Sequence, residues 1–232
     1  MYQKFAAVYD AIYSFKDYAA ESEKIAAIAA EKQPAAKSLL DVACGSGAHL
    51  QHLRAHYACT GLDLSEDLLT VAREKLPDVQ FAHGDMRTFD LGRQFDVVTC
   101  LFAAIGYMTT LSDLRLAIAN MAKHVASGGV MIIEPWITRE NFRSGLFHLM
   151  TAETETMKIA RANTSRIEGD TSVMDFHFMV VSKDGVDLFE EEHRMGLFRV
   201  EDHIAAFEDA GMSAAFDEQG LIGRGLYVAV KK

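Results

Sequence analysis

Short apolar runs alternate with segments of helical periodicity through the first 134 residues of the chain. Five apolar runs predict buried strands: 38–44, 60–63, 79–82, 95–101 and 130–134. The intervening patterns predict helices: 2–32, 48–56, 65–75 and 112–125. We expect Ser65 to cap one helix, and Gly128 with Gly129 to close another. Apolar strands separated by helices predict a parallel sheet that is covered on both faces.

The pattern changes after residue 145. Residues 146–198 alternate between apolar and polar positions, which predicts antiparallel strands with a turn at 183–185. Helical character returns at 200–210, and two strands at 213–217 and 225–230 are expected to close the fold. We therefore expect a single domain over 1–232, of the α/β class with a Rossmann-like sheet. A β-rich cap inserted at 146–198 and a Tyr-rich helical lid at 1–33 complete it.

Composition narrows the range of partners. The chain of 232 residues has a formal net charge of −10, whereas nucleic-acid binding depends on clustered Lys and Arg. No run approaches the roughly 20 apolar residues of a membrane-spanning helix. The three cysteines, Cys44, Cys59 and Cys100, lack metal-ligand spacing, so no metal is expected. Their small, odd number favours a reducing, cytoplasmic location.

A glycine-containing loop follows the first predicted strand. Residues 41–47 read DVACGSG, in which Gly45 and Gly47 permit tight backbone angles and a close approach of ligand to main chain. Such a loop is also compatible with a plain strand-to-helix turn. Asp63 ends the next strand, where this fold delivers a carboxylate to the two hydroxyls of a ribose. The competing role of a helix cap is already filled by Ser65.

Two further positions favour S-adenosylmethionine over a dinucleotide. A dinucleotide site normally has glycine three residues beyond Gly47, but this chain has Leu50. A ligand without a pyrophosphate does not need the close helix approach that leucine obstructs. After the third strand, Asp85 is placed to accept a hydrogen bond from an adenine amino group, with Met86 against the purine. A loop aspartate that caps a turn is the alternative for Asp85.

The chain also resembles a known family through several stretches: KDYAAE at 16–21, SLLDVACG at 38–45, GLDLSED at 61–67, GDMR at 84–87, EPW at 134–136 and GRGL at 223–226. It is similar to the class I methyltransferases, and more specifically to the TDP-aminosugar N,N-dimethyltransferases. That resemblance implies N-methylation of a nucleotide-linked aminosugar, and a homodimer. The chain departs from the family at Phe102–Ala104, at Tyr107 and at 137–139. Methylation of another small metabolite and non-catalytic nucleotide binding stay open as alternatives.

The residues and the resemblance together give a candidate site. The expected cofactor-binding residues are Tyr9, Tyr18, Asp41, Ala43, Cys44, Gly45, Gly47, Asp63, Leu64, Asp85, Met86 and Leu101. The expected acceptor-binding residues are Tyr2, Phe102, Glu134, Trp136, His177 and Arg224, with Arg224 gripping a phosphate. Tyr107 and Tyr13 are the candidate catalytic residues. Tyr107 follows the fourth strand at the edge where ligands bind, and is expected to orient an amine or move its proton.

Overall fold

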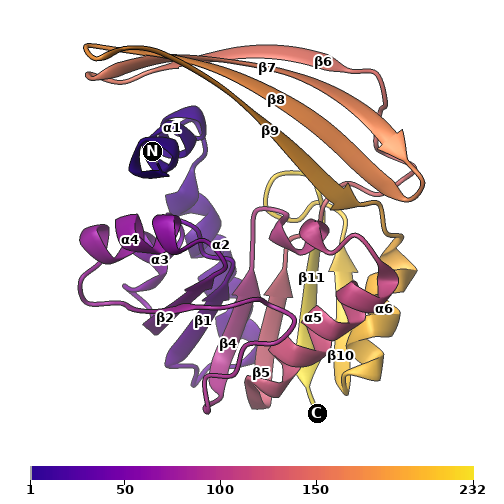
Figure 1. Cartoon of the computed structure of the whole chain (residues 1–232). Helices are drawn as coiled ribbons and strands as arrows, with labels where there is room; N and C mark the ends of the chain where they lie inside the picture. Colours follow the sequence, from indigo (N-terminus) through magenta and orange to yellow (C-terminus); the bar gives the residue numbers. More distant parts are fainter. Residues whose placement is uncertain (1) are drawn as a thin grey trace.

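The computed structural model describes residues 2–232, and side chains from residue 7 onward. The central sheet contains seven strands: β1 (Ser38–Val42), β2 (Ala58–Asp63), β3 (Gln80–His83), β4 (Phe95–Cys100), β5 (Val125–Ile133), β10 (Met212–Asp217) and β11 (Leu226–Lys231). The helices are α1 (Tyr2–Ile12), α2 (Tyr18–Lys32), α3 (Leu50–Leu53), α4 (Glu66–Lys75), α5 (Leu111–Lys123), α6 (Val200–Asp209) and the 3₁₀ helix η1 (Ala104–Tyr107). Figure 1 shows these elements in chain order.

The strand order of the central sheet creates the place where a ligand can bind. The order is β10-β11-β5-β4-β1-β2-β3, with β1 parallel to both β2 and β4, and β11 antiparallel to β5. The chain thus builds outward from β1 in one direction and then resumes at β4 in the other. Loops leaving β1 and β4 diverge at their carboxyl ends and open a crevice. The expectation of a mostly parallel α/β sheet is confirmed.

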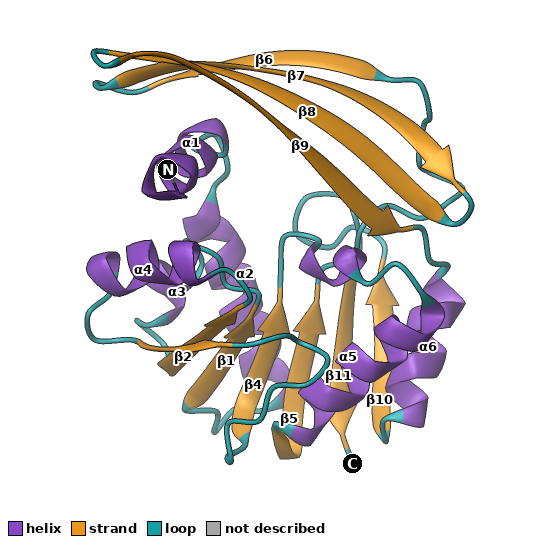
Figure 2. Ribbon diagram, viewed as in Figure 1, coloured by secondary structure: helices purple, strands orange, loops and turns teal. Residues whose placement is uncertain are grey.

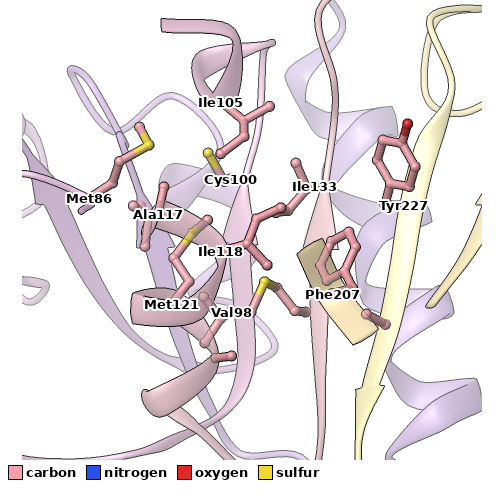
Figure 3. Close-up of a cluster of buried hydrophobic side chains, with 14 of the residues drawn as sticks. Met86, Val98, Cys100, Ile105, Ala117, Ile118, Met121, Ile133, Phe207 and Tyr227 are labelled. Carbon is pink, nitrogen blue, oxygen red and sulfur yellow. The ribbon is translucent and has the colours of Figure 1, made fainter. Parts of the chain in front are cut away.

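Two hydrophobic cores cover the two faces of this sheet. Side chains alternate along each strand, so Leu40 and Val42 of β1 face one core and Leu39 faces the other. The first core packs against α5 and α6, where Ile118 and Phe207 are fully buried (Figure 3). The second packs against α2, α3 and α4. Helices on both faces explain why the strands are apolar throughout.

A second, antiparallel sheet lies across the carboxyl ends of the central strands (Figure 2). Its strands are β6 (Phe147–Glu153), β7 (Met157–Glu168), β8 (Thr171–Ser182) and β9 (Gly185–Gly196), in that order. We call it the cap sheet. Its inner face buries Ile159, Phe178 and Val180 against Val8 and Ile12 of α1. Helix α1 is therefore wedged beneath the cap sheet, which confirms the antiparallel insertion predicted from the alternating pattern.

Two predicted elements were wrong in extent. The helix expected at 48–56 is only α3, because the carbonyl of Leu53 accepts from the amides of both His56 and Tyr57 and tightens the chain into a turn. The strand expected at 130–134 begins at residue 125, so Gly128 and Gly129 lie within β5 and do not close α5. A Cβ on Gly129 would come within 2.8 Å of the Asp96 carbonyl, so this irregular pairing requires glycine.

Glycine also fixes the cap sheet to the core. A Cβ on Gly196, at the end of β9, would lie 2.5 Å from the carbonyl of Met108 just after η1. We expect Gly196→Ala to lower the free energy of unfolding by about 1–3 kcal/mol, because the backbone contact has to open. Urea denaturation measures this. Thr164→Ala, on the outer face of the same sheet, is the control and should change stability by less than about 0.5 kcal/mol; equal stabilities of the two variants would contradict the prediction.

Candidate active site

A cavity of about 1420 Å³ lies between the carboxyl ends of the central strands and the cap sheet. Its floor is formed by loops that follow β1, β2 and β4, one wall by α1 and the segment after it, and its roof by the inner face of the cap sheet. Ordinary small-molecule sites occupy about 300–1,000 Å³. The volume is therefore sufficient for two ligands side by side.

The loop after β1 is shaped for close approach by a ligand. Ala43 has a φ of 59° and Gly45 a φ of 56°, both in the left-handed region. A Cβ on Gly45 would meet no protein atom within 4 Å, so this backbone borders open space. The carboxylate of Asp63 accepts from the amides of Gly45 at 2.7 Å and Ser65 at 2.8 Å. Asp63 therefore holds both neighbouring loops in register at the cavity wall.

The Asp63 carboxylate keeps capacity for a ligand. A carboxylate has about four lone-pair sites, and the two amides occupy two of them. Burial raises the pKa of Asp63, and the hydrogen bonds from Ser65 and Gly45 act in the opposite direction. The remaining lone pairs suit a pair of adjacent hydroxyls, as on a ribose.

The turn after β4 is also strained. Phe102 and Ala103 have φ values of 52° and 61°, an arrangement that costs about 1–3 kcal/mol for each such residue. The Phe102 amide donates to Glu134 Oε2 at 2.7 Å, and this bond holds the turn. The structure thereby corrects the role expected for Glu134. Its side chain is fully buried behind the wall, where it holds the Phe102 backbone and does not line the cavity.

Aromatic rings and one cation form the wall beside this turn. Tyr13 lies edge-on to Phe102 with centroids 4.9 Å apart, and Tyr9 packs against Tyr13 in a tilted arrangement with centroids 4.6 Å apart. Burial raises the pKa of the Tyr9 hydroxyl, so it stays protonated and able to donate. Lys16 lines the same wall, ion-paired with Glu21 and 4.9 Å from the centre of the Phe102 ring. The sequence analysis included Lys16 only within the KDYAAE stretch and did not predict that it lines the site.

Of the two residues expected near adenine, Met86 lines the cavity, as do the expected cofactor residues Leu64 and Leu101. Leu64 is largely exposed. Asp85 lies on the wall, but Arg87 donates to it through the side chain and the backbone amide. These bonds, chiefly those of the guanidinium, hold the pKa of Asp85 below its usual value. Most of its acceptor capacity is therefore already used within the protein.

Arg224 and Trp136 also contribute to the cavity wall. The Arg224 guanidinium lies 5.4 Å from the centre of the Phe102 ring, and its Nε is 3.9 Å from Glu134. At that distance the ion pair is loose, and the guanidinium's fork of donors can serve an anion. Trp136 donates through Nε1 to Ser172 at 2.9 Å, which links the end of β5 to the cap sheet. Both residues line the cavity, and their contact with an acceptor stays a prediction.

The roof contributes polar residues that sequence reasoning missed. Arg161 of β7 donates to the Tyr13 hydroxyl at 3.0 Å, and its Nε is buried without a hydrogen-bond partner. His193 lies on β9, and its Nδ1 is 2.6 Å from the hydroxyl oxygen of Tyr107. The period of two shows only which residues share a face: Arg161 shares a strand face with Ile159, and His193 lies opposite Met174 in register. It does not show which face meets the cavity.

The same alternation corrects the expectation for His177. On β8, Phe176 and Phe178 point inward, so His177 points outward, where it pairs with Glu190 at 3.0 Å. It does not line the cavity. A count of strand faces from either buried phenylalanine would have excluded it.

Four other expected cofactor residues do not line the cavity: Tyr18, Asp41, Cys44 and Gly47. Within this group, the Asp41 carboxylate is buried and accepts a hydrogen bond from Thr99 Oγ1 at 2.7 Å. Burial raises the pKa of Asp41 to about 6. The Tyr18 ring packs edge-on to His49. The side chain of Tyr2 lies outside the described part of the chain, so its expected contact with an acceptor stays a prediction.

Neither a metal site nor a membrane-spanning helix is present in the described part of the chain. Among residues 2–232 with described side chains, no group of three or more His, Cys, Asp or Glu is arranged to hold a metal ion. None of the described helices is both long and apolar enough to cross a membrane.

Comparison with known proteins agrees with this geometry. A family model described as a methyltransferase domain matches residues 39–129. The dTDP-3-amino-3,4,6-trideoxy-alpha-D-glucopyranose N,N-dimethyltransferase of Streptomyces venezuelae is 42% identical over 229 residues, with 97% of each chain covered. The crystal structure of Streptomyces venezuelae DesVI matches with a TM-score of 0.94 and 41% identity, covering 98% of both chains.

A ligand-bound relative bears on the cofactor. CalS10 of Micromonospora echinaspora, an amino pentose methyltransferase solved with S-adenosylmethionine, matches with a TM-score of 0.88 and 38% identity over 97% of both chains. The resemblance seen in the sequence and the choice of S-adenosylmethionine over a dinucleotide are both confirmed. This chain belongs to the S-adenosylmethionine-dependent methyltransferase family that contains the dTDP-aminosugar N,N-dimethyltransferases.

Proposed function

We propose that this methyltransferase N-methylates the amino group of a nucleotide-linked aminosugar. The observation that carries the proposal is a cavity that both the carboxylate of Asp63 and the guanidinium of Arg224 line, and we assign the half beside Asp63 to the cofactor and the half beside Arg224 to the acceptor. An anion-binding guanidinium is unexpected in a protein of net charge −10 unless the acceptor is itself anionic. A nucleotide diphosphate supplies such an anion. The Streptomyces venezuelae relative that is 42% identical is a dTDP-aminosugar N,N-dimethyltransferase.

The residues present fit S-adenosylmethionine in the first half. Asp63 would hold the ribose hydroxyls, and the Gly45 backbone borders the space beside it. Lys16 keeps ammonium protons beyond its pair with Glu21, and these suit the carboxylate of the cofactor's methionine part. Tyr9 would donate a hydrogen bond to the same region. When bound, the cofactor supplies a methyl group already activated by the sulfonium charge.

The chain's own residues then have to position the acceptor and keep water away. Arg224 would grip the diphosphate, and Arg161 offers a second guanidinium on the roof. Phe102 and Trp136 supply ring faces for the sugar or base, and Tyr107 presents a hydroxyl to the amine. Holding nucleophile and methyl in line converts the transfer to an effectively unimolecular step. No metal is invoked.

We expect Asp63→Ala and Asp63→Asn to weaken S-adenosylmethionine binding about ten- to a hundredfold, because charge-assisted hydrogen bonds to the ribose are lost. Isothermal titration calorimetry measures the dissociation constant. Asp67→Ala, exposed in the first turn of α4, is the matched control and should bind as the parent chain does. An unchanged affinity in both Asp63 variants would remove Asp63 from the cofactor site.

A methyl-transfer assay with labelled cofactor tests the acceptor. We expect turnover of a TDP-aminosugar, and an Arg224→Ala variant should raise KM for that acceptor about tenfold or more while cofactor affinity stays unchanged. Arg115→Ala, exposed on α5 and paired with Asp209, is the control. Turnover of an unrelated amine or hydroxyl compound, with every nucleotide sugar inert, would overturn the proposal.

We also propose that a second copy of the chain covers the outer face of the cap sheet. Rows of apolar side chains are exposed there: Phe147 is 82% exposed, Leu149 73%, Leu188 71% and Val186 59%. The registers bring Leu188 beside Met179 and Val186 beside Val181, whereas Phe147 and Leu149 lie on β6 at the opposite edge of the same face. A two-fold axis would place this face against itself, which is the commonest arrangement of a homodimer.

We expect Leu188→Glu and Leu149→Glu to shift the protein from dimer to monomer, because each buries a charge in the apolar contact. Sedimentation velocity measures the mass. Leu116→Glu, at an exposed position on α5, should leave the dimer intact. A monomeric parent chain would refute the dimer.

We place this activity in the cytoplasm. The thiols of Cys44, Cys59 and Cys100 are free, which suits a reducing compartment. A nucleotide-linked sugar and S-adenosylmethionine are both metabolites of such a compartment.

A further inference from the structure

Three polar side chains form a hydrogen-bonded chain that leads from the cavity into the cap sheet. The Tyr107 hydroxyl lies 2.6 Å from His193 Nδ1, and His193 Nε2 lies 3.1 Å from Glu191 Oε2. Tyr107 belongs to η1, whereas His193 and Glu191 lie on β9. The first contact therefore joins the methyltransferase core to the cap sheet at the cavity wall.

Close packing fixes these partners relative to each other. A Cβ on Gly106 would lie 2.7 Å from the Trp136 Cβ and 2.8 Å from the Met195 side chain, so only glycine lets η1 enter between them. The Phe176 ring packs edge-on to the His193 imidazole at 4.9 Å. Both sides of the Tyr107–His193 contact are thus held by the fold, which a relay between fixed positions requires.

The acceptor and donor groups give the chain a direction. An ionised carboxylate only accepts hydrogen bonds, so contact with Glu191 places a proton on His193 Nε2. Nδ1 is then an acceptor, and the Tyr107 hydroxyl donates to it. The lone pairs of the Tyr107 oxygen stay available for a donor in the cavity. Tyr107 is about half exposed, and that exposed surface faces the cavity.

We infer that Tyr107, His193 and Glu191 remove the proton from the acceptor's ammonium group before methyl transfer. This inference rests on the proposed function and deepens it. The ammonium gives one proton to the Tyr107 oxygen as Tyr107 passes its own proton to His193 Nδ1. The nitrogen regains its lone pair, and His193 becomes an imidazolium whose charge Glu191 balances. The imidazolium returns its proton to solvent.

The same relay removes the proton that the product ammonium carries after transfer, so a second methylation at the same nitrogen is equally served. Tyr107 is the residue that touches the acceptor. His193 is the base, acting through Tyr107, and Glu191 is a positioning residue for His193.

The surroundings of His193 favour this role. Glu191 on its own strand and Tyr107 on η1 are the titratable groups in hydrogen-bond contact with it. From β7, Arg161 lies 4.7 Å from the centre of the Phe176 ring and directs a hydrogen bond to Tyr13. His148 on β6 also lines the cavity. Glu191 is thus the charged group in direct contact with His193, whereas Arg161 is held against the neighbouring Phe176 ring.

An experiment without any acceptor tests the geometry. Two-dimensional NMR of the whole chain follows the ring nitrogen resonances of His193 across a pH titration. The neutral ring should carry its proton on Nε2, and Glu191→Ala should shift the proton population between the two ring nitrogens, because the acceptor in contact with Nε2 is removed. Glu190→Ala, one residue away on the outer face, is the matched control and should affect His177 in place of His193. Ring resonances of His193 that Glu191→Ala leaves unchanged overturn the relay.

Kinetics test the chemistry. We expect His193→Gln and Tyr107→Phe each to lower kcat about 10²–10³-fold near neutral pH, with S-adenosylmethionine affinity unchanged. The loss should shrink towards alkaline pH, where the amine deprotonates in solution. The double variant should be no slower than either single variant, since both break one chain. His177→Gln is the control and should retain parent activity.

A merely structural role for His193 gives a different profile, because the loss would then be equal at every pH. That result, or full activity of His193→Gln, refutes the relay. A parent chain that methylates no aminosugar refutes the acceptor proposal instead, and the NMR titration still decides between a coupled and an uncoupled His193.

Discussion

The divergence of β1 and β4 at the centre of the sheet is the constraint on which the site depends. Both strands are parallel neighbours, yet the chain leaves them in opposite directions. The turns are therefore abrupt, and Ala43 after β1 and Phe102 after β4 adopt left-handed backbone angles at the cost of strain. Two side chains hold these turns: Asp63 by the Gly45 amide and Glu134 by the Phe102 amide. Both carboxylates therefore hold the backbone of these turns through hydrogen bonds from its amides.

The second constraint is the height of the cap sheet above this edge. Helix α1 fills part of the space through Val8, Ala11 and Ile12, and Gly196 fixes the opposite end directly onto the chain after η1. The cap sheet is held by α1 and by Gly196, and the cavity lies beneath the part of the sheet between these two contacts. The cap sheet therefore forms the roof of the cavity, whereas the loops of the core supply Asp63 on the cofactor side and Phe102 and Arg224 on the acceptor side.

This division explains what the sequence could predict. The parallel topology dictates the positions of Gly45 and Asp63, so both residues could be predicted from short stretches of the sequence. Glu134 was misplaced because its position at a strand end says nothing of depth, and the structure buries it completely. His193 and Arg161 were missed because the cap sheet's inward face is set by packing on α1, a contact distant in sequence. The strand period predicts which residues share a face, but not which of the two faces meets the cavity.

The same division separates the two tasks of the enzyme. Donor binding needs fixed backbone geometry, and the core supplies it through strained turns that tolerate little change. Deprotonation of an amine needs a base near the acceptor, and a strand in an antiparallel sheet presents one side chain at every second position. Replacement of inner-face residues such as His193 or Asn163 changes the acceptor half without disturbing the loops that follow β1 and β2. We therefore expect acceptor differences between such enzymes to lie mainly on the cap sheet, and the core to specify the reaction.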